Sequence, residues 1–272
     1  MTPLIGIIGF GSIAQDLVSI LLEQDPATRL QVLVRPGRES AARAALAQAG
    51  LPEQALITGD LSAFLATGPN IVAECAGHGA VKDYGPLVLE ARADLIIASV
   101  GAMSDATLSH ALQTAAKASS AQVVIPSGAI GGIDILAAAR LSSLNSVNYT
   151  GHKPPLAWSG TPAQAEFDLG ALDQPTVIFQ GTAREAAQSY PKNANVAATL
   201  ALAGLGMDRT TVRLIADPTT RENIHEFSIS SSAVEASIRL VGQPSPRNPK
   251  TSQTTALSIA RAVLNRNAAI DI

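Results

Sequence analysis

The residues best suited to chemistry stand near the start of the chain, where an apolar run ends in a Gly-x-Gly-x-x-Ala sequence. Such a run predicts a buried parallel strand that turns sharply into a helix, whose free N–H groups can hold a pyrophosphate. In this interpretation Gly9 makes the tight turn, Gly11 lets phosphates approach the backbone, and Ala14 lets the helix pack closely on the strand. Ser12 and Ile13, in the first helical turn, are further candidate contacts. A Gly-rich turn can also be purely structural, but the flanking strand and amphipathic helix favour a dinucleotide site.

The choice of dinucleotide should be made just after the second strand, which is expected over residues 30–34 and is followed by Arg35-Pro36-Gly37-Arg38. An acidic residue here would bind the ribose 2′-hydroxyl of NAD, whereas arginine pairs with the 2′-phosphate of NADP. Arg35 could also stack on the adenine. The alternative is that both arginines are solvated surface residues, and the nearby Glu39 keeps NAD open. The expected cofactor is therefore NADP or NAD.

Three further turns of small residues follow strands expected later in the first half. Ligands of open α/β sheets collect at the carboxyl ends of strands, although each turn could equally be an ordinary corner between a strand and a helix. The glycines of the third turn allow close backbone approach, and the helix that it opens would aim N–H groups at a nicotinamide or a carboxylate. The three turns cover residues 74–78, 99–102 and 126–132.

One histidine lies in an alternating segment of the second half. His225 shares a face of the expected strand 223–230 with Phe227 and Ile229, which predicts a buried or half-buried side chain. A hydrogen-bonded core histidine is the default explanation for this pattern. The catalytic alternative is an imidazole that titrates near neutrality and exchanges protons with a substrate. His78 and His152 are the rival candidates, while His110 is expected at the surface of a helix.

The arrangement of elements predicts two domains. The first half alternates strands with helices, which requires a doubly wound parallel sheet of Rossmann type. From about residue 144 longer alternating strands dominate, which predicts a second α+β domain with a mixed or antiparallel sheet. The expected domains are 1–126 for the dinucleotide and 127–249 for the substrate, with a C-terminal helix within 250–272 packing back on the first domain. Residues 152–162 and 242–249 are expected to be loops rich in proline.

Composition restricts the class of protein. The 272 residues are 47% hydrophobic and carry a formal net charge of −3, so no basic surface for nucleic acid or anionic lipid is expected. We find no signal peptide and no membrane-spanning stretch, which predicts a cytoplasmic protein. The single cysteine, Cys75, excludes an intrachain disulfide and a multi-cysteine metal site, and we expect it to be a small apolar residue at a strand end. No metal is expected.

Several segments together give the chain a resemblance to the L-aspartate dehydrogenase family over nearly its whole length. The resemblance implies reversible oxidative deamination of L-aspartate to oxaloacetate and ammonia through iminosuccinate, with NAD or NADP as hydride partner, and a place in NAD biosynthesis. It also implies His225 as the catalytic acid/base and Ala129 and Asn195 as cofactor contacts. The segments are 99–102 (SVGA), 126–132 (PSGAIGG), 152–155 (HKPP), 181–186 (GTAREA), 191–199 (PKNANVAAT), 203–210 (AGLGMDRT), 216–218 (ADP), 223–226 (NIHE) and 248–252 (NPKTS).

A four-carbon substrate with two carboxylates needs two cationic or N–H-rich subsites. The candidates lie in polar or small-residue segments of the second domain, and some of them must be merely solvated. Asn193 and Asn195 straddle the expected start of a helix, so one of them could be only its N-cap. The cationic candidates are Lys153, Lys192 and Lys250, with Arg184 as a further possibility.

Two other functions stay open on the sequence alone. One is a different two-domain reductase that acts on a semialdehyde or a cyclic imine. The other is a cofactor-binding sensor that has lost catalysis. Whatever the function, an exposed sheet in the second domain favours a symmetric homodimer.

Overall fold

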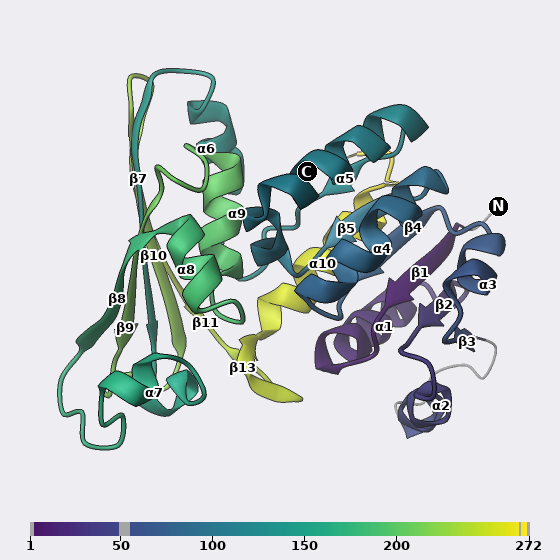
Figure 1. Cartoon of the computed structure of the whole chain (residues 1–272), viewed down its shortest axis with the longest axis horizontal. Helices are drawn as coiled ribbons and strands as arrows, with labels where there is room; N and C mark the ends of the chain where they lie inside the picture. The colour runs from purple at the N-terminus through teal and green to yellow at the C-terminus, as the bar shows by residue number, and fades with distance from the viewer. Residues whose placement is uncertain (1–2, 49–54, 267, 271–272) are drawn as a thin grey trace. The chain divides into compact units, whose positions relative to one another are not determined.

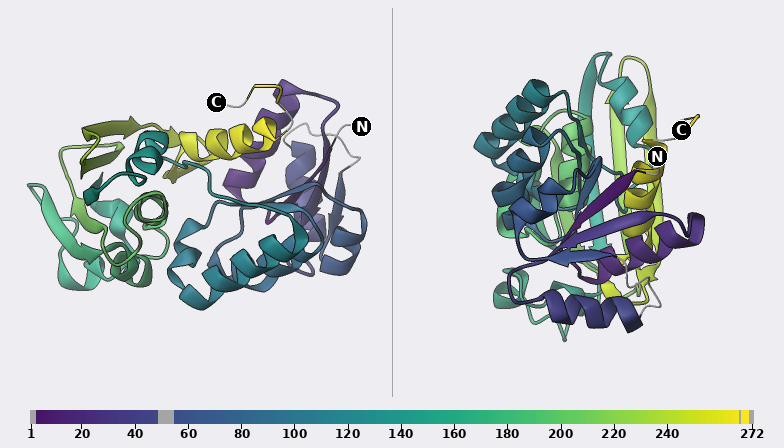
Figure 2. Two further views of the ribbon diagram at one scale, coloured as in Figure 1. Left: turned by 90° about the horizontal axis from the view of Figure 1, so that it is seen from above. Right: turned by 90° about the vertical axis from the view of Figure 1, so that its right-hand side faces the viewer.

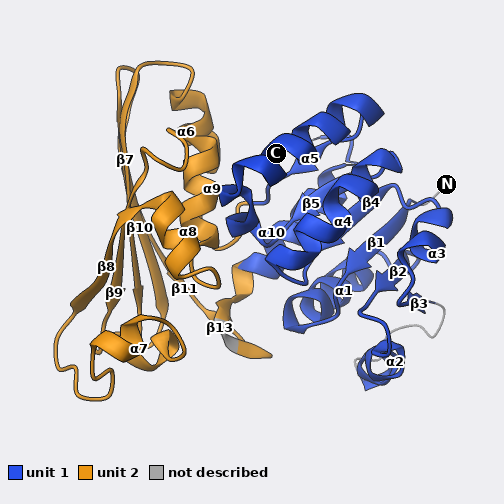
Figure 3. Cartoon of the chain, in the orientation of Figure 1, with its two compact units in different colours: residues 1–126, 255–272 blue, residues 127–254 orange. Residues whose placement is uncertain are grey.

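The computed structural model describes residues 3–48, 55–266 and 268–270, and the chain divides into two compact units. Unit 1 comprises residues 1–126 and 255–272, and unit 2 comprises residues 127–254 (Figure 3). No helix of the described residues is both long enough and apolar enough to cross a membrane.

Unit 1 is built on a six-stranded sheet in the order β3-β2-β1-β4-β5-β6, with every adjacent pair parallel (Figure 1). This is the strand order of the Rossmann fold, and it confirms the predicted fold class of the first half. The inner strands are apolar and buried on both faces, as a parallel sheet covered by helices requires. The strands are β1 (Leu4–Ile8), β2 (Arg29–Leu33), β3 (Leu56–Thr58), β4 (Ile71–Glu74), β5 (Asp94–Ile97) and β6 (Val123–Val124).

Helices cover both faces of this sheet. On one face α1 (Ser12–Gln24), α2 (Glu39–Gln48) and the C-terminal helix α10 (Gln253–Asn265) share a hydrophobic core with the strands. Ile259 and Val263 of α10 are fully or almost fully buried there. Arg266, just after the helix, donates hydrogen bonds to Asp94 and Gln122, so the end of α10 is also held by polar contacts to β5 and to the residue before β6. The remaining helices of the unit are α3 (Leu61–Ala66), α4 (His78–Glu90) and α5 (Ala106–Ser119), with the 3-10 turn η1 (Val100–Ser104).

Two elements of unit 1 were not predicted. The short strand β3 lies at the edge of the sheet and pairs only with β2, and α3 follows it after two residues. Leu56 at the start of β3 is 42% exposed, so the segment lacks the apolar run that marks an inner strand. Tertiary pairing, and not a local pattern, creates this strand.

Unit 2 contains a five-stranded mixed sheet in the order β11-β10-β7-β9-β8. Strands β7 and β9 are parallel and the other pairs are antiparallel, which confirms the expected mixed sheet. Helices α6 (Ile133–Ala139), α8 (Ala183–Ser189) and α9 (Asn195–Ala203) lie along one face (Figures 1 and 2). We call this the covered face and the opposite one the open face. The strands are β7 (Leu144–Lys153), β8 (Thr176–Thr182), β9 (Thr211–Ala216), β10 (Asn223–Ser231) and β11 (Glu235–Gly242).

The prediction of loops over residues 152–162 and 242–249 was partly wrong. His152 and Lys153 are the last residues of β7, because their backbone pairs with β9 as far as Ala216. A 3-10 turn, η2 (Pro155–Trp158), follows them, and α7 (Ala163–Glu166) comes soon after. The second predicted loop forms a small antiparallel pair, β12 (Pro244–Ser245) with β13 (Asn248–Ser252). Prolines at strand ends and edges hid both pairings from the sequence pattern.

The burial of α10 gives a test of its contribution to unit 1. Ile259→Ala should lower the free energy of unfolding by about 3 kcal/mol, because it removes buried methylene groups and leaves a cavity. Leu257→Ala on the same helix is the matched control, since Leu257 is 46% exposed. Urea unfolding followed by circular dichroism measures both. Equal effects of the two changes would contradict the packing of α10 described above.

Candidate functional site

Unit 1 carries a cavity of about 740 Å³ at the carboxyl ends of β1, β2 and β4. That volume falls within the range of small-molecule and cofactor sites. The position is also where open α/β sheets bind their ligands. The lining residues come from the β1–α1 turn, the β2–α2 turn and helix α2, and the start of α4; they include Gly9, Phe10, Gly11, Gln15, Arg35, Arg38, Ala45, Ala76, Gly77 and Tyr84.

The β1–α1 turn has the backbone that the glycine motif predicted. Gly9 has a φ of +87°, and a Cβ there would come within 2.7 Å of the Ala76 Cβ, so both conformation and space require glycine. A Cβ on Gly11 would meet nothing within 4 Å, which leaves open space in front of the first turn of α1. No side chain caps this turn and it has no acidic residue. Its N–H groups therefore suit the pyrophosphate of a dinucleotide.

The neighbouring motif residues take different places. Ala14 is completely buried against the sheet, as predicted for a small residue at the helix–strand contact. Ile13 packs on the hydrophobic core, and Ser12 begins α1. Neither residue is among those that line the cavity.

The two arginines predicted to choose the cofactor both line the cavity. Arg35 and Arg38 are exposed in the turn between β2 and α2. Glu39 is not among the lining residues, and its carboxylate lies against Gly59 instead. The charge at this end of the cavity is therefore positive, which suits a 2′-phosphate.

Glu74 is a buried residue whose carboxylate holds two turns in place near the cavity. Sequence reasoning did not single it out. Its carboxylate accepts hydrogen bonds from the backbone N–H groups of Ala76 and Gly77, both at 2.7 Å, and from the N–H and hydroxyl of Ser99, both at 3.0 Å. The side chain is 1% exposed. It therefore links the turn after β4 to the turn after β5, two of the three small-residue turns noted in the sequence. The signal in the sequence that could have identified Glu74 was a carboxylate at the end of a buried strand, beside a turn of small residues.

Two other residues near this edge have simpler roles. Cys75 packs partly on the core, and burial, assisted by the charge of Glu74, raises its pKa well above the ordinary value. Its thiol stays protonated, as expected of a small apolar residue. His78 is the first residue of α4, and it is not among those that line the cavity.

In unit 2, His225 lies on the covered face of the mixed sheet. Its side chain is 5% exposed, beside the equally buried Phe227 and Ile229, as the alternating pattern predicted. The Nδ1 atom is 2.8 Å from the Tyr149 hydroxyl on β7. Burial, and then the positive charge of Lys153, lower the pKa of His225 to about 4. The expectation that this imidazole titrates near neutrality was therefore wrong for the unliganded protein: the ring is neutral at pH 7.

Lys153 lies at the end of β7 and on the same face as Tyr149, because alternate residues of a strand share a face. Its Nζ donates a hydrogen bond to Asn193 Oδ1 at 3.0 Å and lies 5.6 Å from the centroid of the Trp158 ring. Desolvation lowers the pKa of Lys153 to about 8. A bound anion would offset this desolvation, so Lys153 is a fitting partner for a carboxylate. Asn193 is thus a partner of Lys153, and the N-cap position of α9 is Ala194.

The rival His152 belongs to the open face. It points the opposite way from Lys153 along β7, and its Nδ1 lies 3.0 Å from Asp217 Oδ2. Glu226 Oε2 lies 3.9 Å from its Nε2. The strand thus places His152 on the opposite face of the sheet from His225 and Lys153, because residues 152 and 153 are in a strand and not in the predicted loop.

The other predicted residues of unit 2 are dispersed. Lys192 is exposed beside Asn193. Arg184 pairs with the exposed Asp208 at 2.5 Å, which makes it a surface ion pair. The side chain of Lys250 lies outside the described part of the chain. Ala129, in the turn after Gly128 (φ +66°), is half-buried, and Asn195 is the first residue of α9.

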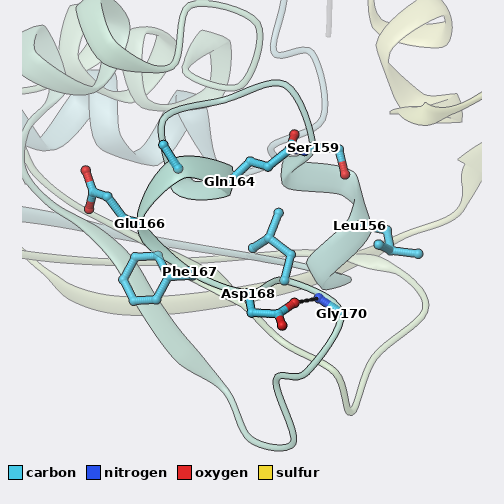
Figure 4. Close-up of a pocket in the computed structure, with 9 residues that line it drawn as sticks. Leu156, Ser159, Gln164, Glu166, Phe167, Asp168 and Gly170 are labelled. Carbon is cyan, nitrogen blue, oxygen red and sulfur yellow. Dashed lines mark hydrogen bonds between the residues drawn. The ribbon is translucent and has the colours of Figure 1, made fainter.

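A separate surface hollow lies between η2 and the segment after α7 (Figure 4). Its polar lining includes the carboxylates of Glu166 and Asp168, and Asp168 Oδ1 accepts a hydrogen bond from the Gly170 N–H at 3.1 Å. No lysine, arginine or histidine lines it. The two negative charges would repel a dicarboxylate, so this hollow is not a substrate site.

The low pKa of His225 should make unit 2 less stable in mild acid. The unfolded chain takes up a proton on this ring near pH 6.5, whereas the folded protein resists it until about pH 4. The unfolded state therefore binds more protons between these values, and the free energy of unfolding falls as the pH falls. From pH 7 to pH 5 this one group should account for a loss of about 2 kcal/mol.

Fluorescence of Trp158, the single tryptophan of the chain, reports the unfolding of unit 2. The reference protein is His225→Asn, which lacks the titrating ring. The wild-type protein should lose about 2 kcal/mol more than the variant between pH 7 and pH 5. Equal losses would place the pKa of His225 at its ordinary value.

Comparison with known proteins identifies the family. Residues 134–266 match the model described as aspartate dehydrogenase, C-terminal, and residues 9–126 match the NAD binding domain of homoserine dehydrogenase. The L-aspartate dehydrogenase of Ralstonia nicotianae is 46% identical, over 98% of this chain and 99% of that protein. The one from Pseudomonas aeruginosa is 44% identical, over 97% and 98%.

Solved structures agree with the sequence relatives. The crystal structure of aspartate dehydrogenase from Thermotoga maritima has a TM-score of 0.78 and 26% identity, and the match covers all of both chains. A hyperthermophilic archaeal homoserine dehydrogenase in complex with NADPH has a TM-score of 0.60 at 12% identity, which shows a shared fold alone. The resemblance inferred from the sequence is thus confirmed, and the chain belongs to the aspartate dehydrogenase family.

Proposed function

We propose that His225 and Lys153 form the substrate site of an NAD(P)-dependent L-aspartate dehydrogenase. As a member of this family the chain is an oxidoreductase that acts on a CH–NH2 group and uses NAD or NADP. The observation that carries the assignment of residues is the placement of a neutral imidazole and a desolvated ammonium on one covered face of the sheet.

The cavity of unit 1 fits the dinucleotide, and bound NAD(P) would accept a hydride from the Cα of aspartate. The first turn of α1, with Gly9 and Gly11, would hold the pyrophosphate through backbone N–H groups. Arg35 would meet the 2′-phosphate of NADP. Glu74 keeps its two turns in place for the nicotinamide end. Ala129 and Asn195 are further cofactor contacts by family resemblance.

Lys153 would bind one carboxylate of aspartate. Asn193 and Trp158 already hold its ammonium group in one position, so little side-chain freedom is lost on binding. The second carboxylate needs another cationic group, for which Lys192 and Lys250 are the candidates. The anion would also raise the pKa values of Lys153 and His225 by favouring their protonated forms.

His225 would supply proton transfer. Loss of hydride from aspartate leaves iminosuccinate, whose hydrolysis to oxaloacetate and ammonia needs a base for the attacking water and an acid for the departing nitrogen. A neutral imidazole can accept the proton of water and return it to the leaving group. With a substrate carboxylate nearby, its pKa would move from about 4 toward the working pH.

We further propose that the protein is a cytoplasmic homodimer, and the open face of unit 2 supports the dimer. Polar and apolar side chains of β8, β10 and β11 are exposed on this face, among them Val177, Val241 and the ion pair of Arg239 with Glu226. None of the described helices of unit 2 lies along it (Figure 1). A second copy related by a two-fold axis would cover it.

We expect Arg35→Ala to weaken the binding of NADP selectively, by about 1.5–3 kcal/mol, since it removes a charge-assisted contact with the 2′-phosphate. Arg43→Ala is the control, because Arg43 is exposed on α2 and does not line the cavity. Titration calorimetry with NADP and with NAD measures the difference. Equal losses for the two cofactors would rule out this role.

The central experiment is His225→Asn, which keeps a hydrogen-bonding side chain but cannot exchange a proton near neutral pH. Turnover with aspartate should fall about 10²- to 10⁴-fold, while folding and NADP affinity stay unchanged. His110→Asn, at an exposed position of α5, should keep full turnover. A folded His225→Asn protein with most of its activity would return His225 to the role of a core residue and direct attention to His78.

A further inference from the structure

We infer that Tyr149 is the positioning residue of this site: its hydroxyl holds the His225 ring through Nδ1, so that Nε2 is the nitrogen that meets the reacting molecule. The inference rests on the proposed role of His225. Tyr149 was not among the residues predicted from the sequence.

The pairing of β7 with β10 brings the two side chains together on the covered face. Tyr149 lies directly opposite Phe227, and His225 lies opposite Gly151, so Tyr149 and His225 are diagonal neighbours. An aromatic side chain spans such a diagonal. The hydroxyl lies 2.8 Å from Nδ1, and the two rings are inclined by 21° with their centroids 6.0 Å apart.

Gly151 is the second observation that supports this arrangement. A Cβ at this position would stand 2.5 Å from the Tyr149 hydroxyl oxygen and 3.1 Å from its Cζ. The backbone of Gly151 is not left-handed, so its conformation does not demand glycine. Its missing side chain instead provides the space through which the tyrosine hydroxyl reaches His225.

The other ring nitrogen is left available. His225 Nε2 has no hydrogen bond to any described residue, yet none of the buried side-chain nitrogens or oxygens in the described part of the chain lacks a partner. Nε2 must therefore reach the surface, although the residue as a whole is 5% exposed. A ring held at Nδ1 and accessible at Nε2 is oriented as a proton-transfer group should be.

A hydroxyl also suits the charge of the site. Burial raises the pKa of Tyr149 above its usual value, so the phenol stays neutral. A phenol oxygen can accept a hydrogen bond from Nδ1–H in the neutral tautomer, which leaves the electron pair of Nε2 free to take up a proton, and it can accept the same bond from the protonated ring. It can therefore hold Nδ1 in either protonation state. On the open face His152 has a carboxylate partner, Asp217, at the corresponding distance of 3.0 Å. A carboxylate beside His225 would favour the charged ring and hold it protonated.

The test is Tyr149→Phe, which keeps the ring and removes the hydroxyl. We expect kcat for aspartate oxidation to fall about tenfold, as for loss of one hydrogen bond. KM for aspartate and the affinity for NADP should stay within about twofold of the wild-type values, because the tyrosine is not proposed to touch either ligand. ¹⁵N NMR of the histidine rings, assigned with His225→Asn, should show one tautomer of His225 in the wild-type protein and a mixture in the variant.

Tyr190→Phe is the matched control, since its buried hydroxyl donates to the Ile178 carbonyl at 3.2 Å. It should leave kcat and the His225 spectrum unchanged. Gly151→Ala keeps the hydroxyl but displaces it, and should reproduce the spectral change if Tyr149→Phe fails to fold. An unchanged kcat or an unchanged spectrum in folded Tyr149→Phe would overturn the inference. Full activity of His225→Asn would instead refute the proposed role of His225, while the spectrum still shows whether Tyr149 holds the ring.

Discussion

Desolvation on the covered face of the mixed sheet controls the protonation of His225 and Lys153, the two residues to which we assign roles in the substrate site. The exclusion of water lowers the pKa of both His225 and Lys153, because it disfavours their protonated forms. The positive charge of Lys153 lowers the pKa of His225 further. Such a cost is tolerated only where hydrogen bonds or a ligand compensate. Tyr149 and Asn193 supply the hydrogen bonds, and an anionic substrate would supply the missing negative charge. The unliganded site is therefore prepared for a carboxylate.

In unit 1 the constraint is different: backbone N–H groups must be accessible to a ligand, with no side chain between them and the ligand. Gly9 brings the β1–α1 turn against Ala76, and the Glu74 carboxylate holds the turns after β4 and β5. A buried carboxylate that accepts four hydrogen bonds is fully compensated. This geometry leaves the first turn of α1 uncapped and open, which is what a pyrophosphate requires.

Much of this organisation was predictable from the sequence. The glycine motif and the regular alternation of strands and helices identified the parallel sheet, and the period of two around His225 identified its buried face. The unpredicted features depend on contacts between distant segments. Strand β3 exists because it pairs with β2, and β7 extends through Lys153 because β9 runs beside it. Without that extension Lys153 could not be grouped with Tyr149 and Gly151 on one face, and His152 could not be assigned to the opposite face.

The most direct test of the account is a crystal structure with NADP and succinate, a dicarboxylate that lacks the reacting amino group. We expect one succinate carboxylate within about 3.2 Å of Lys153 Nζ, and a succinate oxygen at a similar distance from His225 Nε2. The Tyr149 hydroxyl should remain on Nδ1. Succinate bound elsewhere, with His225 Nε2 and Lys153 Nζ both without ligand contact, would contradict the assignment of the covered face as the substrate site.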